Sequence, residues 1–183
     1  MPGIPETHGR WPLVGAVALL PVAAGSVSSP ALRPLAALLA HQTEEWVWPG
    51  GFLPWINEEV LESDSPEFPI DRRAGFIINV GFGWLLSVTA LAGPAAAAPQ
   101  AMLFTSHLGN AGLHIGWAVK NRRYDPGLLT GALALLPVGV SGLRRLLKDP
   151  EASRAGIGAG VVAGGIFAAG MAPFFKRRLK RHG

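Results

Sequence analysis

Two carboxylates and a histidine lie close together near the end of an apolar run at residues 30–48. His41 is followed by Glu44 and Glu45, and no other acidic residue falls inside an apolar run of this sequence. An ionisable side chain is costly at bilayer depth, so one that occurs there is by default a functional-site candidate. On a helix His41 lies one turn before both carboxylates, so at least one of them shares its face. His41, Glu44 and Glu45 are therefore candidate catalytic residues.

A second polar group follows one side of the apolar run at residues 101–119. His107, Asn110 and His114 recur at steps of three and four residues, which places them on one face of a helix. The residues between them are small or apolar. We expect the polar stripe to face the interior of a helix bundle, because lipid offers it no hydrogen-bonding partners. Asn110 and His114 join the list of candidate catalytic residues.

The residue types in these two groups suit a metal ion. Two histidines and one carboxylate with an open coordination position form a common catalytic arrangement for Zn(II) or Fe(II). In this hypothesis Glu44 is the general base and Asn110 orients the substrate. The chain has no cysteine, which excludes thiolate ligands and thiol nucleophiles. The predicted metal ligands are His41, Glu45, His107 and His114.

The elements that carry these residues are typical of a membrane protein. The chain of 183 residues is 49% hydrophobic and only 15% charged. Several apolar runs approach the roughly 20 residues that cross a bilayer core. They are residues 12–28, 30–48, 74–92, 101–119, 127–147 and 155–175. Prolines leave the boundaries of the first two runs poorly defined, so the number of spans is five or six. The sequence predicts an all-α, polytopic transmembrane bundle of five or six spans, with residues 1–183 as a single membrane domain.

The connections suggest an orientation. Lysine and arginine collect at the ends of the apolar runs, which favours membrane orientation over nucleic-acid binding despite the net charge of +4. Most of them share one side if both termini are cytoplasmic, although the group between Arg144 and Arg154 does not. Residues 49–71 are predicted to be an interfacial cytoplasmic loop, and residues 176–183 a basic cytoplasmic tail. The second and fourth runs then descend in the same direction, which brings their polar groups to one depth near the cytoplasmic interface.

Small residues dominate the last apolar run. Gly156, Gly160 and Gly164 recur every four residues, a pattern that lets membrane helices approach closely. The pattern indicates close packing within the monomer or a homodimer through this helix.

The combined motifs resemble a known family. Residues 41–45 read His-Gln-Thr-Glu-Glu, residues 110–114 begin with Asn and end with His, and residues 123–127 read Arg-Tyr-x-Pro-Gly with one position left open. Over about residues 30–137 the chain is similar to the HXXEE-domain family of small bacterial integral membrane proteins. The resemblance implies a multi-pass protein of the bacterial inner membrane but no general activity. Its family-type positions are His41, Glu44, Glu45, Asn110 and His114, whereas His107 is predicted from the stripe alone.

Three functions stay open at this stage. The first is an enzyme that hydrolyses a hydrophobic, lipid-like or isoprenoid substrate with the help of a metal. The second is a metal-free isomerase or cyclase in which Glu44 and Glu45, held at different pKa values, donate and accept protons. The third is a proton-coupled or ion-coupled carrier or an assembly factor. In each case we expect membrane lipids and a hydrophobic small molecule as partners, and no nucleic acid.

Overall fold

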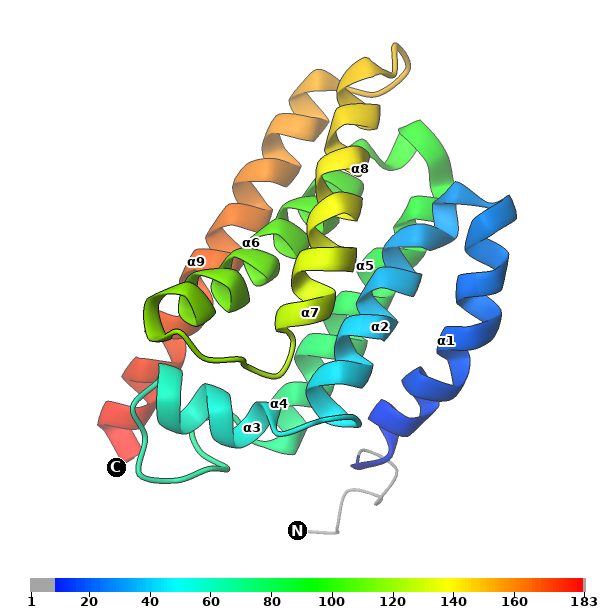
Figure 1. The fold of residues 1–183 in the computed structure, drawn as a ribbon. Helices are drawn as coiled ribbons and strands as arrows, with labels where there is room; N and C mark the ends of the chain where they lie inside the picture. The colour runs from blue at the N-terminus through cyan, green and yellow to red at the C-terminus, as the bar shows by residue number, and fades with distance from the viewer. Residues whose placement is uncertain (1–8, 183) are drawn as a thin grey trace, which may run out of the picture.

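The computed structural model describes residues 9–182, and these form helices without strands (Figure 1). The predicted all-α class is therefore confirmed. The predicted single domain covers residues 1–183, of which 1–8 and 183 lie outside the described residues.

Several of the helices contain stretches of a different helical geometry. In chain order the elements are α1 (Trp11–Ser28), η2 (Pro30–Leu32), α2 (Arg33–Trp46), α3 (Phe52–Pro54), η3 (Trp55–Val60), α4 (Arg72–Phe76), η4 (Ile77–Trp84), α5 (Leu85–Val88), η5 (Thr89–Ala96), α6 (Ala97–Asn121), α7 (Leu128–Thr130), η6 (Gly131–Leu135), α8 (Leu136–Lys148) and α9 (Arg154–His182). The 3₁₀ segments are η2 and η5, and the π-helical segments are η3, η4 and η6. The segments α4, η4 and α5 follow one another without a break, as do α7, η6 and α8, so each trio is one helix with a π-helical stretch.

Two described helices are long and apolar enough to cross a membrane, namely α1, and α9 over Arg154–Arg181. A third span results if the pair Arg72–Val88 and Leu91–Asn121, which is bent by 113°, is a single span. Both α1 and α9 expose large apolar side chains such as Leu20 and Ile166, the kind of surface that lipid covers. The structure is therefore compatible with a membrane protein.

The predicted count of five or six spans is not confirmed, and prolines and a glycine account for the difference. The run at residues 30–48 is divided into the three-residue η2 and the fourteen-residue α2, which is shorter than a bilayer core requires. The run at residues 74–92 ends where Gly93, with a φ of 63°, precedes Pro94 and the chain bends towards α6. By length and composition, the described helices supply two or three spans.

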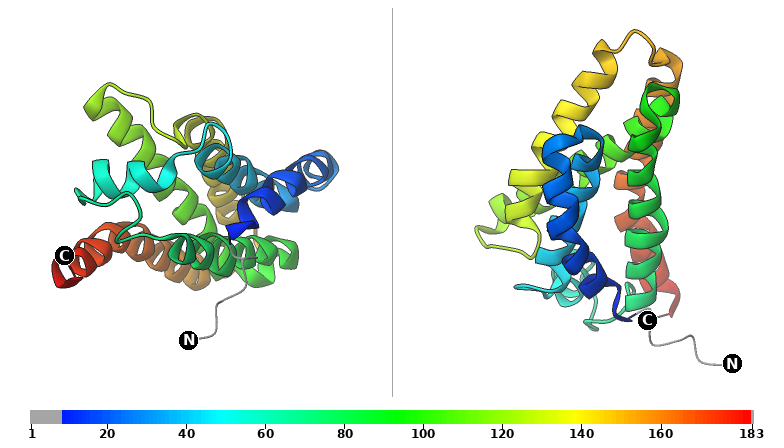
Figure 2. Two further views of the ribbon diagram at one scale, coloured as in Figure 1. Left: turned by 90° about the horizontal axis from the view of Figure 1, so that it is seen from below. Right: turned by 90° about the vertical axis from the view of Figure 1, so that its right-hand side faces the viewer.

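The helix α6 crosses the middle of the molecule. It packs against both α8 and α9, and its Phe104 forms a core with Leu146 of α8 and Ile157 of α9. In both views of Figure 2 the α4–η4–α5 helix and α9 lie on one side of the molecule, and α1, α2 and α8 lie on the other. Side chains from both sides therefore meet around α6.

Residues 49–71, predicted to be an interfacial loop, fold into a compact segment that covers one end of the bundle. We call it the cap. Its Leu53, Ile56 and Leu61 are buried in one cluster with Phe175 of α9. The amide of Asn57 donates to the carbonyls of residues 66 and 70 at 2.9 and 2.8 Å and accepts from the N–H of residue 70 at 3.0 Å, which closes the loop that follows η3.

The basic residues 176–182 continue α9 as helix and hold the cap. Arg178 donates to the carbonyl of Pro69 at 2.8 Å and lies 3.8 Å from Asp71. Lys176 lies 3.5 Å from Glu62. The end of α9 is therefore attached to the cap by charged side chains.

The glycine stripe of α9 packs against α6 within the chain, the first of the two predicted alternatives. A Cβ atom at Gly160 would lie 2.1 Å from the carbonyl oxygen of Ala98, and one at Gly164 would lie 2.7 Å from that of Met102. The glycine face of α9 is covered by α6, so a homodimer through α9 would have to use a different face of this helix. The homodimer stays a prediction.

We expect Gly160→Ala to destabilise the protein by about 1–3 kcal/mol, because the added methyl group overpacks the α6–α9 contact. The matched control is Gly158→Ala on the same helix, where a Cβ meets no atom within 4 Å. Thermal unfolding in detergent measures both variants. An equal melting temperature for the two would contradict the packing described here.

Candidate functional site

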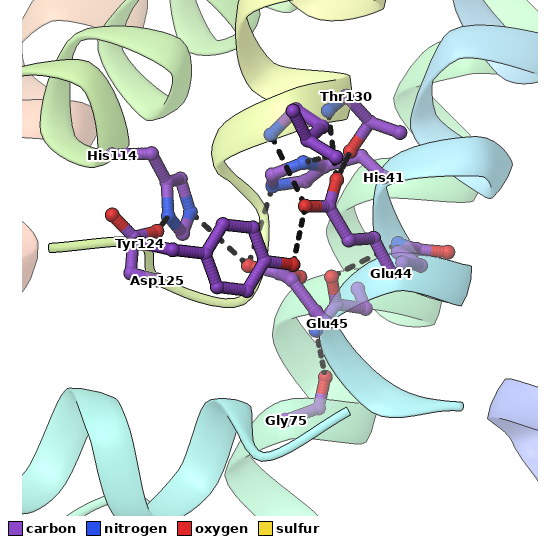
Figure 3. Close-up of polar contacts among 11 residues, drawn as sticks. His41, Glu44, Glu45, Gly75, His114, Tyr124, Asp125 and Thr130 are labelled. Carbon is purple, nitrogen blue, oxygen red and sulfur yellow. Dashed lines mark hydrogen bonds and ion pairs between the residues drawn. The ribbon is translucent and has the colours of Figure 1, made fainter. Parts of the chain in front are cut away.

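Three side chains from two helices converge beneath the cap (Figure 3). His41 and Glu45 lie one turn apart on α2, and His114 comes from α6. The Oε1 atom of Glu45 lies 3.2 Å from Nε2 of His41 and 3.3 Å from Nε2 of His114. All three side chains are buried, and one ligand atom from each lies within 4.8 Å of the others. We call these three residues the His–Glu–His cluster.

The tautomer of His41 follows from its hydrogen bonds. Its Nδ1 atom lies 3.0 Å from the hydroxyl oxygen of Thr130. That hydroxyl donates its single proton to Oε2 of Glu44, so it accepts from His41. Nδ1 of His41 therefore carries hydrogen, and in the neutral ring Nε2 presents a lone pair towards Glu45.

His114 is held in the same way by a carboxylate. Its Nδ1 atom donates to Oδ1 of Asp125, a side chain that is fully buried. In the neutral ring Nε2 of His114 then also presents a lone pair. A histidine that binds a metal usually donates its other ring N–H to a carboxylate or a similar acceptor, which fixes its tautomer and orientation. Asp125 and Thr130 occupy these supporting positions for the two histidines of the cluster.

The distances within the cluster fit a shared cation. The Nε2 atoms of His41 and His114 are buried and make no hydrogen bond, although Glu45 Oε1 is near. Two ligands about 2.1 Å from a tetrahedral zinc ion lie about 3.4 Å apart, which is close to the separations of 3.2 and 3.3 Å between Glu45 and the two histidines.

Glu44 faces away from the cluster and binds the start of the next helix (Figure 3). Its Oε1 atom accepts from the hydroxyl of Tyr124 at 2.8 Å and from the N–H of Leu129 at 3.1 Å. Its Oε2 atom accepts from the N–H of Thr130 at 2.7 Å and from the Thr130 hydroxyl. These four bonds fill the acceptor sites of a carboxylate and satisfy unpaired N–H groups in the first turn of α7. In this arrangement Glu44 has no free oxygen lone pair for the general-base role predicted for it.

The hydroxyl of Tyr124 is one of the four hydrogen-bond donors to Glu44. Partial burial and the hydrogen bond to Glu44 raise the pKa of Tyr124 above its ordinary value. The phenol therefore stays protonated and keeps donating to the carboxylate.

Two further residues pack directly on the imidazole rings. The ring of Trp55 in the cap stacks on His114 with centroids 4.8 Å apart and planes 19° apart. Gly127 has a φ of 119°, and a Cβ atom there would lie 2.6 Å from Cε1 of His114 and 2.8 Å from Cε1 of His41. Glycine is required at this position by the backbone and by the closeness of both rings.

The structure does not bring His107 into the cluster. Its Nε2 atom donates to the carbonyl of Pro34 at 3.2 Å. His107 contacts Pro34, and His114, seven residues later on α6, contacts His41, which is seven residues later on α2. The two helices therefore run in the same direction. His107 therefore lies about two turns before His114 on α6 and away from the cluster.

Asn110 borders an apolar cavity of about 200 Å³ that reaches the cluster at Glu45. The described residues offer its side-chain amide no hydrogen-bond partner. A second cavity of about 410 Å³, between the start of α1 and the cap, also has Glu45 in its wall. Arg72 and Glu67 contribute polar groups to that second cavity. Glu45 thus borders both an apolar cavity and a more polar one.

Sequence reasoning missed four residues of the site: Trp55, Tyr124, Asp125 and Thr130. Asp125 lies in the turn before Pro126 and Gly127, at the open position of the motif at residues 123–127. An aspartate at such a turn is ordinarily exposed, and only its place in the motif could have indicated burial. Trp55 and Thr130 carried no periodic signal.

These features define an all-helical protein with two or three candidate membrane spans and a buried cluster of two histidines and one glutamate. The chain belongs to the HXXEE family: the family described as "Protein of unknown function with HXXEE motif" matches residues 34–141, more than half of the sequence. The resemblance inferred from the motifs is thereby confirmed. No curated protein and no solved structure matches the chain.

We expect Gly127→Ala to disrupt the cluster, because the methyl group would overlap both imidazoles in addition to straining the backbone. The matched control is Gly51→Ala, which has a φ of 93° but whose nearest neighbour is 3.8 Å away. The control should lose about 1–2 kcal/mol from left-handed backbone strain alone. Gly127→Ala should lose a further 1–3 kcal/mol, roughly the cost of overpacking. Equal unfolding free energies in a denaturant titration would refute the close packing of the rings.

Proposed function

We propose that the protein is an integral membrane hydrolase that uses a divalent metal ion, bound by the His–Glu–His cluster, to act on a lipid-like or isoprenoid substrate. One observation carries the proposal. Two imidazole nitrogens and a carboxylate oxygen, all buried, lie within 4.8 Å of one another, and both histidines are fixed by Asp125 and Thr130 on their far sides. Uncompensated burial of a carboxylate and two lone pairs would be costly, and a bound cation removes that cost.

The ligand set suits Zn(II), and Fe(II) is its alternative. A divalent metal with an open position polarises a carbonyl or phosphoryl oxygen and activates water for attack. His41, Glu45 and His114 would hold the ion. Asn110, in the wall of the apolar cavity, is placed to orient the substrate.

The two cavities at Glu45 support hydrolysis of an apolar molecule. The cavity beside Asn110 has mainly apolar walls, and the cavity between the start of α1 and the cap includes Arg72 and Glu67 in its wall. A hydrophobic substrate would approach from the first and water from the second. The reacting bond would then lie next to Glu45.

We also propose that the remaining apolar helices complete a bundle of five or six spans in a bacterial inner membrane. The cluster lies at the end of the molecule that carries the cap, the start of α1 and the end of α9 (Figure 1). The end of α9 is rich in lysine and arginine, and basic residues favour the cytoplasmic side. The active site would therefore be close to the cytoplasmic interface.

A second candidate is metal-free acid and base catalysis, for example isomerisation or cyclisation of an isoprenoid. His114 lies between two carboxylates, Glu45 and Asp125, and such a chain can also carry protons. Protons in place of a metal would then offset the buried charge. Metal content distinguishes the two candidates.

We expect protein purified in mild detergent to hold about one zinc or iron ion per chain, as counted by elemental mass spectrometry. Glu45→Gln and His114→Ala should each lose most of this metal, because each removes a ligand. The matched control is His107→Ala, which removes a histidine from the same helix but not from the cluster and should retain the metal.

Lipid extracts supply the test of activity. Cells that express the wild-type chain should accumulate a hydrolysis product that cells expressing Glu45→Gln lack. The metal-dependent mechanism would be rejected if the wild-type protein holds no stoichiometric metal and its melting temperature does not change when zinc or a chelator is added. If Glu45→Gln still abolished lipid conversion in that case, the metal-free candidate would be favoured.

We expect Asp125→Asn to weaken metal binding about 10–100-fold, the usual effect of removing a carboxylate that supports a histidine ligand. The amide nearly matches the carboxylate in shape, so the fold should persist. A competition titration with a chromophoric chelator measures the affinity, with the exposed Glu58→Gln as control. Unchanged affinity would show that Asp125 does not support a ligand.

A further inference from the structure

Few polar groups in the wall of the apolar cavity are free to meet a ligand. Asn79, Ser106 and His107 in its wall are engaged: Asn79 accepts from Gln42 at 2.9 Å, Ser106 donates to the Met102 carbonyl at 2.8 Å, and His107 donates to Pro34. Glu45 and Asn110 are thus the polar groups in the wall that can meet a ligand. Most of the remaining wall is apolar and includes Ile78, Phe82, Leu103, Phe167, Met171 and Phe175.

The size and lining of the cavity select a hydrocarbon group. Apolar cavities of about 150 Å³ in other proteins stay dry and bind benzene, and this one measures about 200 Å³. A polar headgroup placed against the apolar part would leave its hydrogen bonds unmade, at a cost of several kcal/mol. The ligand that fits is therefore a hydrocarbon segment whose polar end reaches Glu45 and Asn110.

The cavity borders the outer surface of the bundle where η4 and α9 meet. Phe82 of η4 stacks on Phe167 of α9 with ring centroids 4.1 Å apart and planes 18° apart. Both rings are only partly buried. The α4–η4–α5 helix exposes Ile77 and Leu85, with exposed fractions of 55% and 68%, and α9 exposes Ile166 with 68%. In a bilayer this apolar surface contacts lipid tails, so the Phe82–Phe167 pair separates the cavity from the hydrocarbon core.

We propose that this cavity binds one hydrocarbon chain of a membrane-dissolved amphiphile, which enters from the bilayer between η4 and α9 at the Phe82–Phe167 pair. The polar end of the amphiphile lies at Glu45 and Asn110. This inference names the substrate class of the proposed hydrolase, and it rests on the proposed function for the reaction at the polar end of the amphiphile. Chain binding itself is measured independently of metal and of turnover.

The probe is a long-chain fatty acid with a photoreactive diazirine near its tail, added to the full-length protein in phospholipid nanodiscs. After illumination, mass spectrometry should locate adducts at cavity residues such as Met171. Ile78→Trp fills the cavity and should reduce labelling of Met171 about tenfold. The matched control is Ile77→Trp, the preceding residue, whose side chain is exposed and does not line the cavity. It should leave labelling unchanged.

A second variant covers the case in which Ile78→Trp does not fold. Phe82→Ala removes part of the wall instead of adding to it, and should speed labelling of Met171 severalfold. Adducts confined to exposed positions such as Ile166, or equal labelling in Ile77→Trp and Ile78→Trp, would overturn the proposal. So would labelling of Met171 that Phe82→Ala leaves unchanged.

Metal content measured on the same samples separates the two proposals. Cavity labelling without bound metal would reject the metal-dependent hydrolase and keep the chain-binding site. Stoichiometric metal without cavity labelling would reject the chain-binding site and leave the metal centre standing.

Discussion

The structure depends on how a buried carboxylate and two buried imidazoles are compensated. Glu45 is 3% exposed and both histidines of the cluster are 0% exposed, so water does not solvate the charge. Such a group is tolerated only when a cation or a complete set of hydrogen bonds offsets its desolvation. The surrounding elements meet part of this need. Asp125 and Thr130 fix the imidazoles from behind, and the ring of Trp55 covers His114. What they leave is a point between three acceptor atoms that a cation can fill.

The adjacent glutamates of the motif have different tasks because successive residues of a helix point in different directions. Glu45 is one turn after His41 and shares its face, whereas Glu44 turns towards the first turn of α7. An anion at a helix N-terminus satisfies N–H groups there and is stabilised by the helix dipole. Thr130 connects the two tasks, since its hydroxyl donates to Glu44 and accepts from His41. The motif therefore positions the buried pair His41 and Glu45. Through Glu44 it also positions the neighbouring helix, whose Thr130 orients His41.

Helical periodicity was sufficient to predict the parts of the site that lie on regular helices. The i to i+4 spacing of His41 and Glu45, and the inward face of α6, correctly brought His114 to them. The stripe alone does not show which of His107 and His114 belongs to the cluster. Seven residues of helix span about 10 Å, and this distance is too long for a single metal ion to bind both histidines. Trp55 and Asp125 lie in or next to irregular segments, where no period links sequence to position. The predicted number of spans exceeds the two or three that the described helices supply by length and composition, because composition does not reveal where proline or Gly93 divides an apolar run.

The position of the cluster within the bundle bears on how a hydrolase could work on a molecule that prefers lipid. Water and a hydrocarbon chain seldom share a space, so the reacting bond must lie where two different spaces meet. Glu45 is in the wall of both cavities, the apolar one beside α6 and α9 and the one that lies between α1 and the cap. The cap contributes residues to both walls, and Arg178 joins the cap to the end of α9. A cation at the cluster would therefore have apolar walls on one side and polar groups on the other, the arrangement that a proposed lipid hydrolase requires.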